Sequence, residues 1–420
     1  MRTMICWGSR QAARSSGKQH LAVFSYNGRS ELAAATLGTD AYAYDYDNIG
    51  NRKTAREIEE EFAYTANELN QYTSIEQSIP DSSLSPREQP FVPTYDADGN
   101  QTKIRTATGV WTAEYNALNR PVRFTRTAED GTVTTVTGDY DYMGRRIFKK
   151  VETTVADPET GESTTSVILN HRYLYRGHLQ IAALDLTRTT LNALWYILWD
   201  PTEPVATRPL AIQTAGSWFV YGWDLTKNVM ELYKSNGTIA NSYSYAPFGE
   251  VTQRGNITNP LQWSSEVFDG ELGLVYYNYR HYTPHDGKWT TRDPIGIEER
   301  FNLYVFVNND ISKIDILGLE PYHMCILLSA KEMQHGDVAW EFGPLQGRII
   351  TKRSCKFRCY HNTPNNCYNI PCWSWCQKDH GVEILVFTLS KNRKIQAPTC
   401  ASVAGEVQMK ILTSGKTKSI

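Results

Sequence analysis

Short stretches of alternating apolar and β-branched or polar residues run along the first 290 residues, as in 133–137 (VTTVT). Alternation with a period of two is typical of a half-buried strand, because successive side chains point to opposite faces of a sheet. No long helical period is visible in 90–290. Two-residue signals for tight hairpin turns punctuate the chain at Asn27-Gly28, Asp130-Gly131, Asn236-Gly237 and Asp286-Gly287. The pattern predicts a mainly β fold of antiparallel hairpins.

A short Tyr-Asp unit recurs along the same part of the chain. Clear copies stand at 46–52 (YDNIGNR), 95–100 (YDADGN) and 140–146 (YDYMGRR), and degenerate copies at 115–120 (YNALNR) and 66–71 (ANELNQ). In this unit the Tyr ends a strand and can stack on its neighbour. The Asp or Asn accepts backbone N–H bonds, and the later Gly or Asn supplies a positive φ. Each copy therefore predicts one hairpin, with turns at 47–50, 96–99 and 141–144.

One segment, 55–69 (AREIEEEFAYTANEL), has residues of good helix propensity. The Tyr-Asp unit runs through it, however, and favours a strand followed by a turn.

Composition and charge divide the chain in two. The 12% of aromatic residues favours strands, and 41% hydrophobic against 21% charged residues argues against disorder. From 320 onward there are 13 Lys and Arg against 7 Asp and Glu, whereas 1–319 holds 30 against 38. Seven of the eight cysteines also lie after residue 320. An acidic body and a basic, Cys-rich tail indicate two parts that are stabilised differently.

Export signals are not visible in the sequence. No apolar run reaches the length of about 18 residues that a membrane span needs, and the N-terminus has no apolar core of a secretory signal. We expect either that the chain is not exported by that route or that it is the C-terminal piece of a longer product.

The repeated units resemble the YD repeats of the Rhs family. Residues 243–250 (YSYAPFGE) resemble a further family segment, with Ala246 in place of its Asp. Residues 268–319 resemble the Rhs repeat-associated core signature almost throughout. Its blocks are GLVYY at 273–277, RHY at 280–282, GKW at 287–289, RDPIG at 292–296 and NLY at 302–304.

This resemblance implies an antiparallel β-hairpin ribbon that spirals into a shell, as in bacterial polymorphic toxins, the C components of insecticidal toxin complexes and the teneurins. A repeat region of about 280 residues predicts a partial shell. The implied domains are an N-terminal remnant or linker (1–39), the YD-repeat ribbon (40–267), the core signature (268–319) and a variable effector-like domain (320–420).

The resemblance also implies a function. The shell would enclose and present a C-terminal toxin, with a cognate immunity protein and a bacterial secretion machinery as partners, no cofactor, and a secreted or cell-surface location. The alternatives are a teneurin-like adhesive ribbon without enzymatic activity and a decayed fragment.

Candidate chemistry lies at the end of the core signature. Two aspartates held together can share a proton, so that one acts as general base and the other as general acid. Asp293 and Asp315 match the two aspartates of self-cleaving relatives, and Arg280 matches an upstream arginine that could orient a carboxylate. The expected cut follows Leu319.

Two departures weaken the match. Ile316 stands where the family has a Pro after its second Asp, and Asn309-Asp310 replaces Asn-Pro. Both Asp-x-x-Gly pieces are also good turns, so a purely structural role stays open.

The tail offers cysteines but no catalytic motif. Cys355, Cys359, Cys367, Cys372 and Cys376 are closely spaced, and His361 and His380 lie nearby. A disulfide-stapled domain is favoured. The weaker alternative is zinc held by four of Cys355, Cys359, Cys372, Cys376, His361 and His380, because Cys-x3-Cys is less usual than Cys-x2-Cys. Residues 382–389 (VEILVFTL) predict one buried strand.

Overall fold

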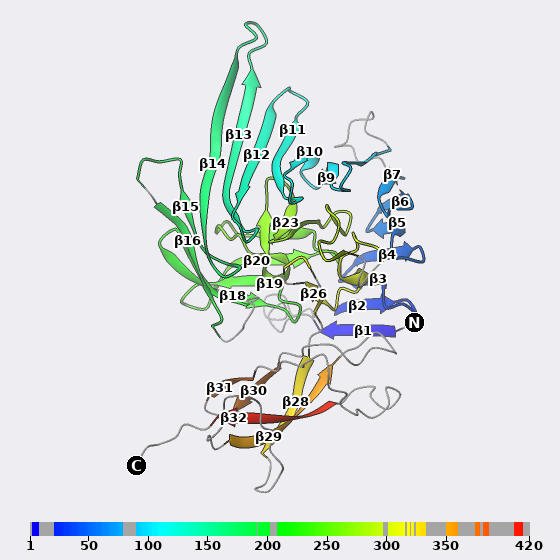
Figure 1. Cartoon of the computed structure of the whole chain (residues 1–420), viewed down its shortest axis with the longest axis vertical. Helices are drawn as coiled ribbons and strands as arrows, with labels where there is room; N and C mark the ends of the chain where they lie inside the picture. Colours follow the sequence, from blue (N-terminus) through cyan, green and yellow to red (C-terminus); the bar gives the residue numbers. More distant parts are fainter. Residues whose placement is uncertain are drawn as a thin grey trace. The chain divides into compact units, whose positions relative to one another are not determined.

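The computed structural model shows a chain built from antiparallel strands (Figure 1). It describes residues 2–7, 21–78, 90–190, 192–201, 208–296, 301–315, 317–319, 321–322, 325–332, 350–359, 374–378, 381–385 and 407–414. Over these ranges there is no α-helix, and helical geometry is limited to 3-10 turns such as η2 (Trp263–Ser265) and η4 (Val307–Asn309). The mainly β, antiparallel prediction is confirmed. In the same ranges no helix is long and apolar enough to cross a membrane.

The chain divides into two compact units, Met1–Pro321 and Tyr322–Ile420. The first unit contains two sheets in which every strand pairs with its neighbours in the sequence. The strands of the seven-stranded sheet are β1 (Arg2–Trp7), β2 (Leu21–Tyr26), β3 (Leu32–Leu37), β4 (Asp40–Tyr46), β5 (Arg52–Glu57), β6 (Glu60–Ala66) and β7 (Tyr72–Gln77).

The second sheet of this unit has fourteen strands. They are β8 (Thr94–Tyr95), β9 (Gln101–Thr106), β10 (Gly109–Tyr115), β11 (Pro121–Thr127), β12 (Val133–Tyr140), β13 (Arg146–Ala156), β14 (Ser163–Arg176), β15 (Leu179–Asp185), β16 (Asn192–Trp199), β17 (Pro209–Thr214), β18 (Ser217–Trp223), β19 (Val229–Tyr233), β20 (Ile239–Tyr245) and β21 (Val251–Arg254). Unbroken sequential pairing of this kind makes a ribbon of hairpins.

The sequence range 55–69 falls on β5, β6 and the turn after them, so the strand-and-turn prediction is correct and the helical alternative is wrong. Strands β1 to β3, which lie within 1–39, pair into the same sheet as β4.

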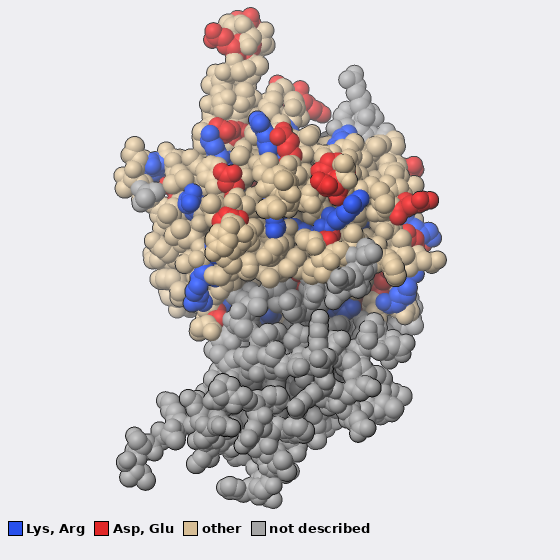
Figure 2. All heavy atoms as spheres, in the orientation of Figure 1, with Lys and Arg blue, Asp and Glu red and all other residues tan. Residues whose placement is uncertain are grey.

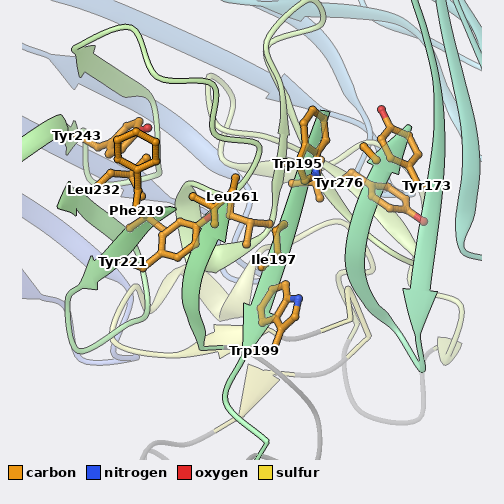
Figure 3. Packing of buried hydrophobic residues seen from close by; sticks show 14 residues of the cluster. Tyr173, Trp195, Ile197, Trp199, Phe219, Tyr221, Leu232, Tyr243, Leu261 and Tyr276 are labelled. Atoms are coloured by element: carbon orange, nitrogen blue, oxygen red, sulfur yellow. The ribbon is translucent and has the colours of Figure 1, made fainter. Parts of the chain in front are cut away.

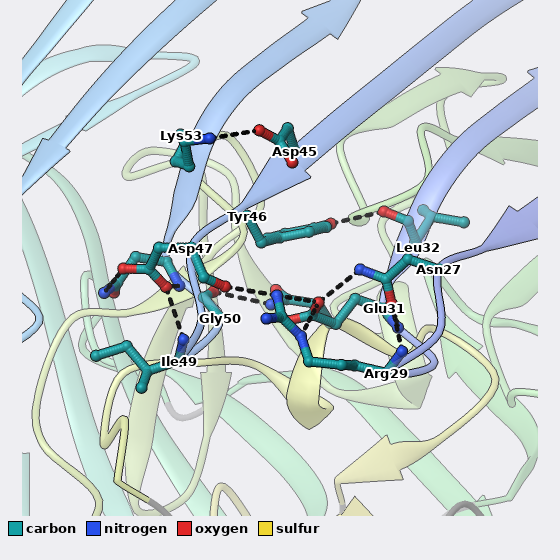
Figure 4. A network of polar contacts seen from close by, with 12 residues as sticks. Asn27, Arg29, Glu31, Leu32, Asp45, Tyr46, Asp47, Ile49, Gly50 and Lys53 are labelled. Carbon is teal, nitrogen blue, oxygen red and sulfur yellow. Dashed lines mark hydrogen bonds and ion pairs between the residues drawn. The ribbon is translucent and has the colours of Figure 1, made fainter.

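Every Tyr-Asp unit forms the same turn. In the unit that begins at Asp47, the Asp47 amide donates to the Asn51 carbonyl at 2.9 Å and Gly50 donates back to the Asp47 carbonyl at 3.4 Å. The Asp47 carboxylate accepts from the amides of Ile49 and Asn51, both at 2.9 Å (Figure 4). Gly50 has φ +89°, a conformation that glycine adopts without steric cost. The predicted turns at 47–50, 96–99 and 141–144 are all present.

In three of these units the tyrosine before the turn ties its hairpin to an earlier one. The hydroxyl of Tyr46 donates to the carbonyl of Leu32 at 2.8 Å (Figure 4), and that of Tyr115 donates to Gln101 at 2.7 Å. Tyr140 reaches Pro121 at 2.9 Å in the same way. In each case the acceptor is the fifth residue after the Asn or Asp that starts the previous turn of this kind, at Asn27, Asp96 or Asn116. The repeat spacing thus fixes the register between successive hairpins.

Aromatic residues dominate the interior of the large sheet. Trp195, Tyr173 and Tyr276 pack together (Figure 3), with the rings of Tyr173 and Trp195 6.4 Å apart. Tyr276 belongs to a separate four-stranded sheet made of β22 (Val267–Asp269), β23 (Leu274–Tyr277), β24 (Arg280–Thr283) and β25 (Lys288–Trp289). Residues of the core signature therefore form part of the hydrophobic core against which the ribbon packs.

The ribbon also curves back on itself. Phe248, in the turn after β20, packs edge-on against Tyr44 of β4 with ring centroids 4.9 Å apart. The guanidinium of the buried Arg52 lies over the Phe248 ring at 4.1 Å. The last hairpin of the large sheet consequently contacts the first sheet.

In the second unit the structure describes only the backbone of several strands. A three-stranded sheet contains β28 (Cys325–Glu332), β29 (Ile350–Cys359) and β32 (Val407–Ser414), and a pair contains β30 (Ser374–Lys378) and β31 (Gly381–Leu385). Of the expected strand 382–389, residues 386–389 lie outside the described residues, as do Cys367, Cys372, His361 and His380. The disulfide and zinc predictions stay predictions.

Candidate functional site

The three residues singled out in the core signature come from three separate segments. Arg280 begins β24, Asp293 follows β25 in the Arg-Asp-Pro-Ile-Gly turn, and Asp315 ends the short strand β26 (Ile314–Asp315). All three are buried. The structure brings them together around one guanidinium.

Arg280 bridges the two carboxylates. Its Nη2 lies 3.1 Å from Oδ2 of Asp293 and 3.5 Å from Oδ2 of Asp315. Its Nε donates to the carbonyl of Gly318 at 2.5 Å, and the guanidinium lies over the Trp289 ring at 4.0 Å. Two buried carboxylates would repel each other, and the shared cation offsets that repulsion.

Asp315 also shapes the segment that follows it. Its Oδ1 accepts from the amides of Leu317, Gly318 and Leu319 at 3.2, 2.7 and 3.1 Å. Gly318 has φ +75°, and a Cβ there would stand 2.9 Å from the Tyr277 carbonyl oxygen. The close packing of this backbone requires glycine at position 318. The same backbone conformation places the Gly318 carbonyl within hydrogen-bonding distance of Arg280.

A solvent recess lies next to Asp293. Its volume is about 380 Å³, and its lining includes Asp98, Leu118, Tyr279, Arg292 and Asp293. Asp98 and Leu118 belong to turns of the Tyr-Asp units. Asp293 therefore borders a space that admits water.

A third acid lies in the electrostatic field of Asp315. Burial raises the pKa of Glu266 well above its usual range, and the negative charge of Asp315 raises that pKa further. The carboxyl group of Glu266 is therefore more easily protonated than an exposed glutamate.

Sequence reasoning identified the three charged residues but not the groups that hold them. Trp289 lies in the GKW block and Gly318 within the 268–319 signature, yet nothing in their spacing indicated a contact with Arg280. Ile316 and Glu320 lie outside the described residues. The described residues contain no cluster of three or more His, Cys, Asp or Glu side chains suited to a metal ion.

The sequence is similar to proteins from several bacteria. It is 25% identical over 259 residues to the tRNA3(Ser)-specific nuclease WapA of Bacillus spizizenii, a match that covers 60% of this chain and 9% of WapA. It is 25% identical over 300 residues to toxin subunit YenC1 of Yersinia entomophaga, covering 66% of this chain and 29% of YenC1. The chain therefore spans less than a third of the length of either relative.

A solved structure, that of TcdB2-TccC3, aligns with 72% of this chain and 19% of that chain, at 18% sequence identity and a TM-score of 0.36. The model of the Teneurin YD-shell family matches residues 2–312. That match covers well over half of the sequence and the hairpin ribbon described above, and the chain accordingly belongs to the teneurin YD-shell family.

Proposed function

We propose that this YD-shell chain carries a C-terminal effector and releases it by cutting its own backbone between Leu319 and Glu320. Arg280, Asp293 and Asp315 would form the aspartic autoprotease. The observation that carries the proposal is the position of Arg280, which contacts both carboxylates and the carbonyl of Gly318, one residue before the expected cut.

The chemistry needs one base and one acid. One carboxylate takes a proton from a water molecule, which adds to the carbonyl carbon of Leu319. The other carboxyl gives its proton to the amide nitrogen of Glu320 as the C–N bond breaks. The products are a carboxylate at Leu319 and a free amine at Glu320, so water is the only reactant consumed. The recess beside Asp293 supports access of that water.

The test is to express the full chain and to look for a new N-terminus at Glu320 by intact mass and N-terminal sequencing. Asp293→Asn and Asp315→Asn should each leave the chain uncut, because either change removes one proton-transfer role. Asparagine at 315 keeps the oxygen that accepts the three amides, so the turn itself survives.

Asp224→Asn is the matched control. Asp224 starts another, half-buried turn of this kind, where its Oδ1 accepts the amides of Thr226 and Asn228 at 2.9 Å. This variant should cut like the wild type. A folded wild-type chain that stays intact would refute the autoprotease and leave both motifs as turns.

The effector role of the tail has a separate test. Expression of residues 320–420 in a bacterial host should arrest growth, and a cognate immunity protein should restore it. Nuclease activity in a relative, the tRNA3(Ser)-specific nuclease WapA, supports an effector role for the tail. An adhesive ribbon would predict neither cutting nor growth arrest.

A further inference from the structure

The hairpin of β13 and β14 projects beyond its neighbours in the ribbon (Figure 1). On one side, β12 pairs with β13 only as far as Thr154. On the other side, β15 pairs with β14 only from His171 onward. We call the part of this hairpin between residues 151 and 170 the arm.

The arm has an open edge along β14. Among the described residues, 163–169 pair with β13 alone. The Asp157 amide donates to the Glu162 carbonyl at 2.7 Å, and hydrogen-bonded pairs alternate along an antiparallel ladder. The backbone groups of Ser163, Thr165 and Val167 therefore point outward, away from β13.

This edge lacks the usual protection against strand pairing. Residues 163–169 (STTSVIL) contain no charge and no proline, and natural sheets use both to block their edges. Val167 and Ile168 expose 46% and 60% of their surface. The one irregularity is a bulge opposite Val151 and Glu152 at the base of the arm.

Charge is distributed unevenly along the arm. Asp157, Glu159 and Glu162 lie in or beside its terminal turn, and Figure 2 shows acidic side chains gathered at this tip. The arm contains no Lys or Arg. Beyond its base, Arg172 and Arg188 are exposed.

We propose that the open edge of β14 pairs with the same edge of a second copy of this chain. Antiparallel pairing about a two-fold axis near Ser166 places residue 163 of one copy opposite residue 169 of the other. The acidic tip of one arm then lies beside Arg172 and Arg188 of the other copy. The pairing gives hydrogen-bond partners to the outward groups of Thr165 and Val167 and covers Ile168. One seven-residue edge is a small interface, so we expect a dissociation constant on the order of 10 µM.

Sedimentation equilibrium of the full chain over roughly 1–100 µM measures this dimer. Thr165→Pro removes an outward N–H without removing a bond to β13, and it should weaken dimerisation at least about tenfold. Thr165→Val keeps the N–H and should dimerise like the wild type. Unchanged circular dichroism and thermal midpoint would show that each variant is folded.

Charge reversal tests which surfaces meet. Glu159→Lys and Arg188→Glu should each weaken the dimer several-fold, because each sets like charges against each other, and the double variant should recover it. A wild-type chain that is monomeric throughout this range would overturn the proposal. Binding of an extended peptide from another protein by a monomeric chain would overturn it as well, in favour of a different occupant.

Discussion

Replacing Asp269 by asparagine tests the buried charge cluster that joins the ribbon to the core signature. Asp269 is fully buried at the end of β22. Arg146 of β13 binds it with two nitrogens, at 2.5 and 2.8 Å, and Lys149 binds it at 2.9 Å. Lys149 also contacts Glu271 at 2.8 Å. These cations hold the pKa of Asp269 well below its usual range against the opposing effect of burial.

The expected loss of stability is large. Asparagine keeps the shape of the side chain but leaves the positive charge of Arg146 without its buried counter-ion. Breaking one partner of a buried ion pair costs about 3–5 kcal/mol. Because the folded-state pKa of Asp269 is lowered, its contribution is present above about pH 4 and disappears as the pH falls through the folded-state pKa. The deficit of Asp269→Asn should therefore shrink in acid.

The assay is urea denaturation of the full chain followed by tryptophan fluorescence at several pH values. Asp45→Asn is the control, because Asp45 pairs with Lys53 at 2.9 Å with both side chains more than half exposed and such pairs contribute about 0–1 kcal/mol. A loss below about 1 kcal/mol for Asp269→Asn at neutral pH, or a deficit that does not change with pH, would refute the reasoning.

Three further predictions concern the turns and the core. Tyr46→Phe should lower the free energy of unfolding by about 1 kcal/mol, since one interhairpin hydrogen bond is lost, whereas Tyr142→Phe, at a side chain that is 93% exposed, should change nothing in the same denaturation. Gly318→Ala should cost about 2 kcal/mol and slow the appearance of the new N-terminus, because φ is +75° and a backbone oxygen stands 2.9 Å from the new Cβ. Gly131→Ala, with φ +82° and nothing within 4 Å, should leave cutting unchanged, and equal cutting in both variants would contradict the close-packing argument. Burial lowers the pKa of His281 to about 3 from 6.5, so the unfolded state takes up a proton first and stability should fall as the pH drops below about 6.5. His281→Gln should flatten that part of the profile of denaturation midpoint against pH, and an unchanged slope would argue against a buried neutral histidine.

Local chemistry made the turns predictable from sequence. Asp47 can accept the amides two and four residues later, and Gly50 tolerates positive φ, so the unit specifies its own geometry wherever it occurs. The same logic found the less regular turn at 66–71, where Asn67 and Asn70 replace Asp and Gly. Hairpins between such turns pair with their neighbours in the chain, which makes the antiparallel ribbon a local property as well.

Contacts between distant segments needed the tertiary structure. Arg146 and Asp269 stand 123 positions apart, and no spacing rule connects them. Resemblance to the core signature pointed to Arg280, Asp293 and Asp315. Only the packing of β24, the turn after β25 and β26 puts one guanidinium between the two carboxylates.

The sequence by itself determined the repeating turn, the strand order and the residues of the candidate site, because each depends on interactions within a few residues or on a motif. The tertiary structure decided how Gly318 reaches Arg280, how Arg146 reaches Asp269 and where β14 extends past β15. Each of these depends on the distance between segments that fold onto each other, and that distance is set by packing of the whole sheet rather than by any local pattern.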